Sequence, residues 1–344
     1  MSEMITFRIR RFNPESGEEA YYEDFTFEPP NPEATLLDCI NHIKWHIDGT
    51  LTYRMSCRSA ICGSCAMRVN GGGQLVCNAQ FHDFLDENGM VTIEPVGNMP
   101  VVKDLVTDFS DFWNKVHSVN PYVQYADESA ERSNDGEHRM DPSDFAKIDE
   151  ASTCILCGAC YSECVSYEAD RNFLGPAALA KAQRLVNDTR DETKHERLEA
   201  LSEYGGMWDC AHCFACVQAC PKPVNPLYRI IDLRREAHKE GFHDNNGSRH
   251  ARGFVEIIEE SGWLDEAKLP VKSVGSVGEW VADLLPMGVR MGLKNKYRPN
   301  PIHLIPGRHH PEIPKMEEVK TIIQKTRLDK EDETAEAEGE PDNG

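Results

Sequence analysis

The sequence predicts an α+β protein, in which a small domain of strands and one helix precedes an all-helical region. Residues 4–10 and 21–27 alternate apolar and polar side chains, as half-buried strands do, whereas apolar residues after Lys103 recur at helical spacings of three and four. Of the 13 cysteines, all but Cys39 fall into three tight groups of four, one in the first region and two in the second. Each region is therefore expected to carry its own metal-ligating thiols.

Length, hydropathy and charge exclude several classes of protein. A chain of 344 residues with 40% hydrophobic residues can build two or three domains, which excludes a fully disordered or collagen-like chain. No apolar run approaches the roughly 18 residues of a membrane span, and the N-terminus lacks the apolar core of a signal peptide. The net charge of −21 argues against a nucleic-acid partner, which would need a basic surface. A soluble or peripheral protein is expected.

In the first region, a helix is expected after the two strands. Thr35 is the predicted N-cap, with Asp38 as the third helical residue. The stripe that this helix is expected to bury consists of Leu36, Ile40, Ile43 and Ile47. Cys39 lies on the same face, so we interpret it as a buried, inert thiol and not as a ligand. Further strands are expected around Val76 and at 90–93.

The second region is expected to be helical throughout. Residues 103–116 have helical spacing, and the polar residues 127–144 are expected to form an exposed connection. Pro176 and Pro226 are each expected in the first turn of a helix, where proline loses no hydrogen bond. Gly241 is expected to be the C-terminal cap of the second of these helices.

The C-terminal part has a mixed pattern. A helix is expected near 254–260, and a second apolar stretch at 277–293 is interrupted by Pro286 and followed by basic residues. We favour an ordinary core helix for this stretch over an edge that docks on a partner or a membrane surface. Residues 299–314 are rich in proline and histidine. The tail from 329 to 344 holds eight acids and one lysine and is expected to be disordered.

The first cysteine group has the spacing of a plant-type [2Fe–2S] site. Cys57-x4-Cys62-x2-Cys65 is followed by Cys77 from a neighbouring strand. The loop contains Gly63 and several small residues, so it can wrap around an inorganic core and point backbone N–H groups at the sulfurs.

The second and third groups repeat the run C-x2-C-x2-C-x3-C of two-cluster ferredoxins, in which the fourth cysteine serves the other cluster. One [4Fe–4S] cluster is therefore expected on Cys154, Cys157, Cys160 and Cys220. A second tetranuclear cluster is expected on Cys164, Cys210, Cys213 and Cys216.

Zinc is the main alternative, because pairs of the form C-x2-C also build structural zinc sites. We favour clusters, since three cysteines at these close spacings are typical of iron–sulfur ligation. Neither a GxGxxG loop nor a P-loop is found. Three clusters in one chain predict an electron conduit without a substrate pocket of its own.

Several segments resemble the iron–sulfur subunit of succinate dehydrogenase and fumarate reductase. They are 56–67 (SCRSAICGSCAM), 100–106 (PVVKDLV), 154–157 (CILC), 173–178 (FLGPAA), Cys220-Pro221-Lys222 and Asn225-Pro226. The resemblance covers about residues 4–241. It implies a β-grasp ferredoxin domain followed by an α-helical ferredoxin domain, a flavoprotein partner that interconverts succinate and fumarate on FAD, and a membrane-associated partner that handles quinone.

With this resemblance, the domains are expected at 1–102 (β-grasp, [2Fe–2S]), 103–241 (α-helical, two tetranuclear clusters), 242–328 (extension) and 329–344 (acidic tail). The resemblance also implies an oxidoreductase of respiratory electron transport. It places this chain peripherally on the cytoplasmic face of a membrane, without a transmembrane segment.

Two departures from the family pattern bear on the third cluster and on quinone. Most of the family lacks a cysteine at the position of Cys213 and holds a [3Fe–4S] cluster there; the full set here favours [4Fe–4S]. Residues 165–169 (VSYEA) replace the proline and tryptophan that help to form the usual quinone pocket. The extra cysteine and the extension resemble variant complexes whose third subunit is similar to cysteine-rich, heterodisulfide-reductase-like proteins, with a methylmenaquinol or thiols as donor.

Three functions compete on the sequence alone. The first is the electron-transfer subunit of a succinate:quinone or quinol:fumarate oxidoreductase. The second is the corresponding subunit of a thiol-dependent fumarate reductase or another flavoprotein complex. The third, of a different class, is a structural zinc-binding scaffold.

Overall fold

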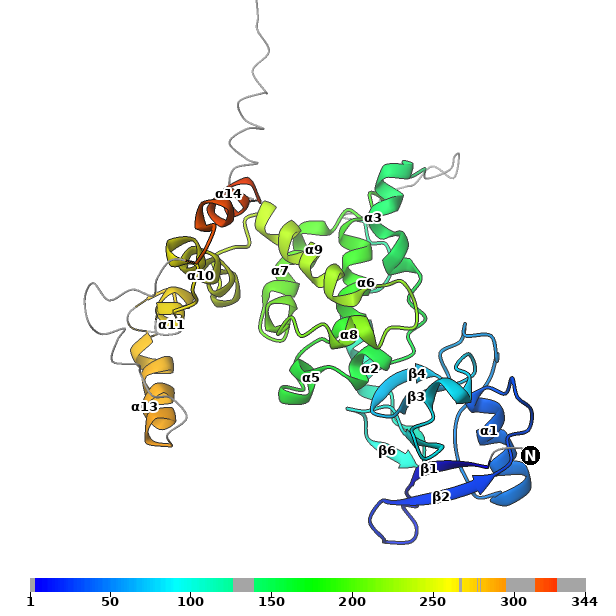
Figure 1. Ribbon diagram of the computed structural model, residues 1–344. Helices are drawn as coiled ribbons and strands as arrows, with labels where there is room; N and C mark the ends of the chain where they lie inside the picture. The colour runs from blue at the N-terminus through cyan, green and yellow to red at the C-terminus, as the bar shows by residue number, and fades with distance from the viewer. Residues whose placement is uncertain are drawn as a thin grey trace, which may run out of the picture. The chain divides into compact units, whose positions relative to one another are not determined.

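The protein forms two compact units, Met1–Arg234 and Arg235–Gly344 (Figure 1). The structure is a computed structural model. It describes residues 4–125, 139–265, 268–276, 278, 280–294 and 313–326. The expected acidic tail, much of the Pro- and His-rich segment and most of the 127–144 connection lie outside these residues. The finer domain boundaries at 102 and 328 stay predictions.

A five-stranded mixed sheet forms the N-terminal part of the first unit. In spatial order its strands are β2 (Tyr21–Phe27), β1 (Ile5–Arg11), β5 (Met90–Glu94), β3 (Ala66–Val69) and β4 (Gly72–Leu75). β1 runs parallel to β5 and antiparallel to β2, and β3 is antiparallel to both of its neighbours. The two predicted N-terminal strands and the strand at 90–93 are confirmed. The strand expected around Val76 ends earlier, because β4 ends at Leu75; Val76 and Cys77 therefore lie in the turn after it and not in a strand.

One helix packs its apolar stripe into the core of this sheet. α1 (Leu36–His42) begins with the predicted capping box, in which the Thr35 hydroxyl oxygen accepts from the Asp38 N–H and the Asp38 carboxylate accepts from the Thr35 N–H. Ile47 is exposed, because η1 (Ile43–Ile47) widens to a π-turn and rotates it away from the stripe. Cys39 is fully buried, and burial raises its pKa to about 12, which agrees with an inert thiol.

The segment after residue 100 differs from its predicted helix. It first forms a two-stranded ribbon, β6 (Val101–Lys103) and β7 (Val106–Thr107), and α2 (Ser110–Ser118) begins only afterwards. Buried Asp104 holds the turn between the strands: its carboxylate accepts from Arg11 Nε at 3.1 Å, from the Phe12 N–H at 3.1 Å and from the Thr52 N–H at 2.9 Å. These partners are distant in sequence, so helical spacing could not reveal the turn.

Helices make up the rest of the first unit. They are α3 (Pro142–Ser152), α4 (Ala159–Ser162), α5 (Val165–Ala169), α6 (Pro176–Val186), α7 (Lys194–Ser202), α8 (Ala215–Gln218) and α9 (Pro226–Lys239), with short 3₁₀ turns η2 (Phe81–Phe84) and η3 (Met207–Asp209). The helix starts at Pro176 and Pro226 are confirmed. Gly241 follows α9 with φ +87°. α3 also begins with a proline in its first turn, and its start at Pro142 corrects the connection expected to extend to residue 144.

The sheet and the helices of the first unit are joined around α4. Arg68 of β3 forms an ion pair with Glu163 at 3.0 Å, and the Gly97 N–H donates to Ser162 Oγ at 2.9 Å. The Asn98 side-chain amide donates to the carbonyls of Tyr161 and Ser162. A Cβ added at Gly73 of β4 would lie 3.1 Å from the Ala159 Cβ. The second cysteine group, which includes part of α4, is thus held directly against the sheet.

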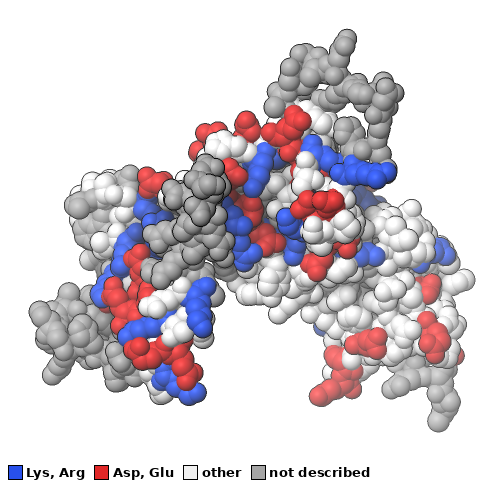
Figure 2. All heavy atoms as spheres, turned by 90° about the horizontal axis from the view of Figure 1, so that it is seen from above, with Lys and Arg blue, Asp and Glu red and all other residues white. Residues whose placement is uncertain are grey.

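The second unit contains α10 (Asn246–Ser261), α11 (Lys268–Ser273), η4 (Trp280–Leu284), α13 (Leu285–Leu293) and α14 (Met316–Thr326). Lys268 and Lys272 of α11 form ion pairs with Glu260 and Glu256 of α10. The expectation of an ordinary core helix is wrong for α13, because none of its side chains is buried. In the ranges described above, no helix is long and apolar enough to cross a membrane. On the face in Figure 2, acidic and basic side chains are interspersed over the described parts of the surface.

Candidate iron–sulfur sites

The first cysteine loop directs backbone N–H groups at its own sulfurs. The N–H groups of Ser59 and Cys62 lie 3.4 and 3.3 Å from Cys57 Sγ, and the Ala60 N–H lies 3.3 Å from Cys77 Sγ. Arg58 and Ala60 take left-handed backbone conformations, with φ of 54° and 53°. Such residues turn successive N–H groups to one side, which creates an anion-binding concavity. The wrapping loop expected from the sequence is confirmed in this respect.

The four thiols of this loop differ in exposure. Cys57 and Cys62 are exposed, whereas Cys65 and Cys77 are buried beneath them. The Ser64 hydroxyl, helped by backbone N–H groups, lowers the pKa of Cys62 to about 6. Burial raises the pKa of Cys65 to about 12, and the nearby Cys77 and Cys62 contribute in the same direction. The loop therefore has one solvent-facing edge and one edge turned into the protein.

The second run has the fourth cysteine of the third run beside it. Cys157 and Cys160 are buried and Cys154 is half-buried. Burial raises the pKa of Cys157 to about 11, and the charges of Cys220 and Cys154 raise it further. Burial also raises the pKa of Cys160 well above its usual value, and the charges of neighbouring thiols, among them Cys154 and Cys220, raise it further. Cys154, Cys157, Cys160 and Cys220 line one small cavity, so the structure brings Cys220 to the second run.

The third run is arranged in the reciprocal way. Burial raises the pKa of Cys164 to about 11, with further contributions from Cys210 and Cys213. Burial raises the pKa of Cys216 to about 12, and the charges of Cys210, Cys164 and Cys213 contribute in the same direction. Cys213 is exposed but lies within electrostatic reach of the other three thiols. The Ala211 N–H donates to Ser166 Oγ at 3.0 Å, so the structure brings the segment that follows Cys164 to the third run.

The two repeated runs also share one backbone conformation. Two and four residues after the first cysteine, each has a positive φ: 56° and 81° at Leu156 and Gly158, and 55° and 63° at His212 and Phe214. Three of these four residues are not glycine, and a left-handed conformation costs such residues about 1–2 kcal/mol each. Because the angles match, Cys213 holds the same position in the turn of the third run as Cys157 holds in the turn of the second run.

Gly63 brings the first loop into contact with the second. It has φ +74°, and a Cβ built on it would lie 2.9 Å from the Cys157 Cβ, 3.0 Å from the Cys157 Cα and 3.2 Å from the Ile155 carbonyl oxygen. Any side chain here would push the two loops apart. The second and third runs are adjacent as well, since α4 contacts α8 and the charge of Cys216 raises the pKa of Cys160, whose largest shift comes from burial.

Arg234 of α9 supports the third loop, a role that the sequence analysis did not identify. Its guanidinium donates to the carbonyls of Met207, Trp208 and Cys210 at 2.7–3.1 Å and approaches His212 Nε2 at 2.5 Å. It also lies over the Trp208 ring, 5.2 Å from the centroid. Burial lowers its pKa, so this cation is held in a weakly solvated position beside the loop. The sequence signal was an arginine flanking the apolar stripe of α9.

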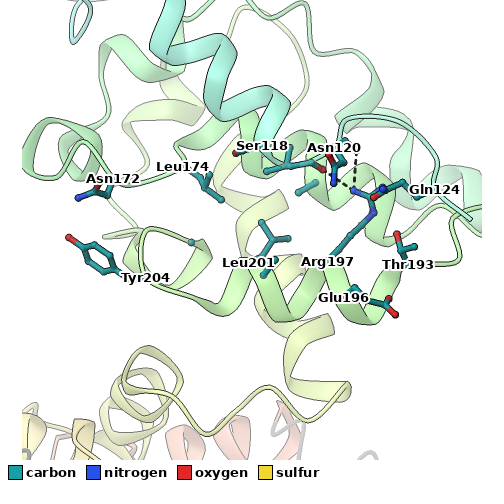
Figure 3. A pocket seen from close by; sticks show the side chains of 14 residues that line it. Ser118, Asn120, Gln124, Asn172, Leu174, Thr193, Glu196, Arg197, Leu201 and Tyr204 are labelled. Atoms are coloured by element: carbon teal, nitrogen blue, oxygen red, sulfur yellow. Dashed lines mark hydrogen bonds between the residues drawn. The ribbon is translucent and has the colours of Figure 1, made fainter. Parts of the chain in front are cut away.

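One cavity of the first unit is formed without any of the cysteines. It has a volume of about 400 Å³ and lies between α7 and the segment after α2 (Figure 3). Arg197 uses all of its N–H groups there, on Asp191 and on the carbonyls of Val119, Asn120 and Tyr122. With no donor left for a ligand, this arginine braces the packing of the helices.

Clustered thiols beneath inward-facing N–H groups fit sulfide-bridged iron, because N–H donors stabilise negative charge on the sulfurs. Among the described residues, no group of three or more His, Cys, Asp or Glu is spaced to hold a single metal ion. Residues 6–114 match the 2Fe-2S iron-sulfur cluster binding domain family, and residues 150–224 match the 4Fe-4S dicluster domain family. Fold and sites define a ferredoxin-type electron-transfer protein.

The relatives narrow this class. The chain is 40% identical over 230 residues to the fumarate reductase iron-sulfur subunit of Mycobacterium tuberculosis, covering 67% of this chain and 91% of the relative. It is 31% identical over 321 residues to the 8-methylmenaquinol:fumarate reductase iron-sulfur subunit of Wolinella succinogenes, covering 91% of this chain and 97% of the relative. The chain belongs to the family of iron–sulfur subunits of fumarate reductase and succinate dehydrogenase, which form oxidoreductase complexes.

The relatives also resemble this chain in its C-terminal extension and in its fold. Because the Wolinella alignment covers 91% of this chain, it includes much of the extension after residue 241. Among solved structures, the Mycobacterium smegmatis Sdh1 complex in the apo form matches with a TM-score of 0.60 at 24% identity, over 71% of this chain and 99% of that chain. This match, with the mixed sheet and the helical region that follows, confirms the predicted β-grasp and α-helical ferredoxin folds.

Proposed function

We propose that this chain carries electrons singly through three clusters, between an FAD-containing succinate/fumarate subunit and a membrane-associated, quinone-reactive subunit. The observation that carries the proposal is the serial arrangement of the cysteine groups. Gly63 of the first loop packs against Cys157 of the second run, and α4, which carries Cys160, contacts α8, which carries Cys216. Such a series fits a relay with one entry and one exit.

The proposed ligand sets follow the thiol neighbourhoods. A [2Fe–2S] cluster would be held by Cys57, Cys62, Cys65 and Cys77, and a [4Fe–4S] cluster by Cys154, Cys157, Cys160 and Cys220. The third set is Cys164, Cys210, Cys213 and Cys216. Each bound cluster would supply reversible one-electron redox chemistry. The protein orients the thiolates and directs N–H groups at them, which favours the more negative reduced state.

For the third site we favour [4Fe–4S] over [3Fe–4S]. The φ angles two and four residues after the first cysteine are positive in both runs, and Cys213 holds the place in the third run that Cys157 holds in the second. A cube has four iron corners, and this arrangement offers a thiolate to each of them.

The exposure of side chains beside the first and third cysteine loops supports a partner contact at each of these loops. The buried cysteines of the second run support no partner contact there. Ile61, beside the first loop, is 65% exposed, and Phe214 in the third loop is 44% exposed, whereas Cys157 and Cys160 are buried. We assign the first loop to the flavoprotein. In succinate oxidation, the FAD of that subunit would accept two electrons and two protons from succinate. It would then release the protons and pass the electrons one at a time through the clusters to the third loop. Fumarate reduction runs the same path in reverse.

Residues 165–169 lack the proline and the tryptophan that help to form the usual quinone pocket of the family. Tyr167 stands in the substituted segment and is buried, with its hydroxyl bonded to Asp111 and the Arg171 guanidinium over its ring. The Wolinella relative is named for 8-methylmenaquinol and aligns with much of the extension. We therefore assign a methylmenaquinol to the complex, handled by a cysteine-rich third subunit on the cytoplasmic face of the membrane.

Purification of the intact complex with identification of its subunits tests this function. We expect a flavoprotein and a membrane-associated subunit to copurify, and succinate oxidation to be coupled to a quinone. Coupling to thiols and not to quinone would instead support the thiol-dependent reductase. A colourless protein would support the zinc scaffold, since bound iron–sulfur clusters absorb visible light. Cys39→Ser is the matched control, because this buried thiol lies outside all three sets and should leave the colour unchanged.

A further inference from the structure

The helical segment that ends at residue 293 leaves its apolar side chains in solvent. All residues of α13, coloured orange in Figure 1, are exposed. The exposed fractions are 40% for Leu285, 54% for Met287, 53% for Val289 and 83% for Leu293. Soluble proteins rarely expose contiguous apolar patches without a binding role. The face of α13 therefore needs an occupant.

The residues of α13 are segregated by chemistry. Residues four apart share a face of an α-helix, so the sequence of α13 divides into rows along its axis. Three adjacent rows hold only apolar residues or glycine: 285, 289 and 293; 288 and 292; 287 and 291. The remaining row holds Pro286, Arg290 and Lys294. The helix thus has a wide apolar face and a narrow cationic edge.

The charge around α13 is opposite to that of the chain as a whole. The protein has 58 acidic against 37 basic residues, yet no Asp or Glu occurs between Asp283 and Glu312, where five Lys and Arg residues occur. Among the described side chains, no carboxylate forms an ion pair with Arg290 or Lys294. This local positive charge is complementary to an anionic surface.

We infer that α13 lies in the interface of an anionic lipid bilayer. Its apolar face would enter the boundary between headgroups and acyl chains, while Arg290 and Lys294 reach the phosphates. A wide apolar face with a cationic edge is typical of helices that lie in the membrane plane. A second copy fits less well, because it would cover the apolar face but offer no anionic complement to the local positive charge. The inference rests on the proposed location at the membrane and deepens it.

Vesicle flotation of the full-length protein tests the inference. We expect the protein to float with mixed phosphatidylcholine–phosphatidylglycerol vesicles and much less with pure phosphatidylcholine. Each basic residue near an anionic surface strengthens binding about fivefold, so Arg290→Gln/Lys294→Gln should weaken it about 30-fold. Met287→Ser/Leu293→Ser should weaken it more than tenfold, because two apolar side chains no longer enter the bilayer. Val271→Ser in α11, at a position that is 55% exposed, is the matched control and should bind as the unmodified protein does.

Several outcomes would overturn the inference. They are no flotation, equal flotation of the α13 variants and the control, and equal affinity for neutral and anionic vesicles. A lipid-free dimer that the α13 variants abolish would assign the face to a second copy instead. Visible spectra of the same samples report on the clusters separately, so failure of lipid binding and failure of the electron-transfer function are distinguishable.

Discussion

Gly63→Ala should separate the first two cysteine loops, since Gly63 is where they touch. Alanine at φ +74° costs about 1–2 kcal/mol in backbone conformation. Its Cβ would also lie 2.9 Å from the Cys157 Cβ, and overpacking of this kind costs typically about 1–3 kcal/mol. The free energy of unfolding should therefore fall by about 2–5 kcal/mol.

Gly71→Ala is the matched control. Gly71 has φ +81° and nothing within 4 Å of an added Cβ, so only the backbone cost of about 1–2 kcal/mol applies. Gly63→Ala should lose more unfolding free energy than the control does. Each additional kcal/mol should lower its midpoint of thermal unfolding by about 2–4 °C relative to Gly71→Ala.

The assay is thermal unfolding of both variants in the cluster-loaded protein, followed by circular dichroism. Reduction of the tetranuclear clusters through the [2Fe–2S] cluster is then timed by rapid mixing. We expect Gly63→Ala to slow this step and Gly71→Ala to leave it unchanged, because only the former widens the gap between the loops. If the two variants have equal midpoints of thermal unfolding and equal rates of cluster reduction, the proposed contact between Gly63 and Cys157 is refuted.

Three further predictions concern the tetranuclear sites. Cys220→Ala should damage the cluster that we assign to Cys154, and EPR showing loss of only the other tetranuclear cluster would mean that each run closes on itself. Cys213→Val should convert the third cluster to [3Fe–4S] with a raised midpoint potential, measured by redox titration; an unchanged spectrum would show that Cys213 is no ligand. Arg234→Met should destabilise the loop before Cys210 by more than about 2 kcal/mol in chemical unfolding, because it leaves several carbonyls without a donor; unchanged stability would contradict this role of Arg234.

Local chemistry explains which parts of the fold could be predicted. The capping box of Thr35 and Asp38 and the helix starts at Pro176 and Pro226 depend on neighbours within a few residues. The ribbon around Asp104 depends instead on Arg11, Phe12 and Thr52, and helical spacing in the same segment concealed it.

The candidate sites divide in the same way. Cysteine spacing predicted the three groups, because tight turns fix where the thiols of one run point. The crossed ligation came from the two-cluster ferredoxin pattern and stays a prediction. The serial order of the groups depends on tertiary contacts at Gly63 and at Cys160, which spacing does not encode. The exposure of α13 was missed for a related reason: an apolar pattern shows that a helix needs a partner but does not show that the partner belongs to the same chain.

EPR of the purified complex, poised at a series of potentials, tests whether the chain carries three clusters with a complete third site. We expect one [2Fe–2S] signal and two interacting [4Fe–4S] signals, with only traces of an oxidised three-iron cluster in the air-isolated sample. A three-iron signal at full occupancy that Cys213→Val leaves unchanged, or the absence of a second tetranuclear cluster, would contradict it.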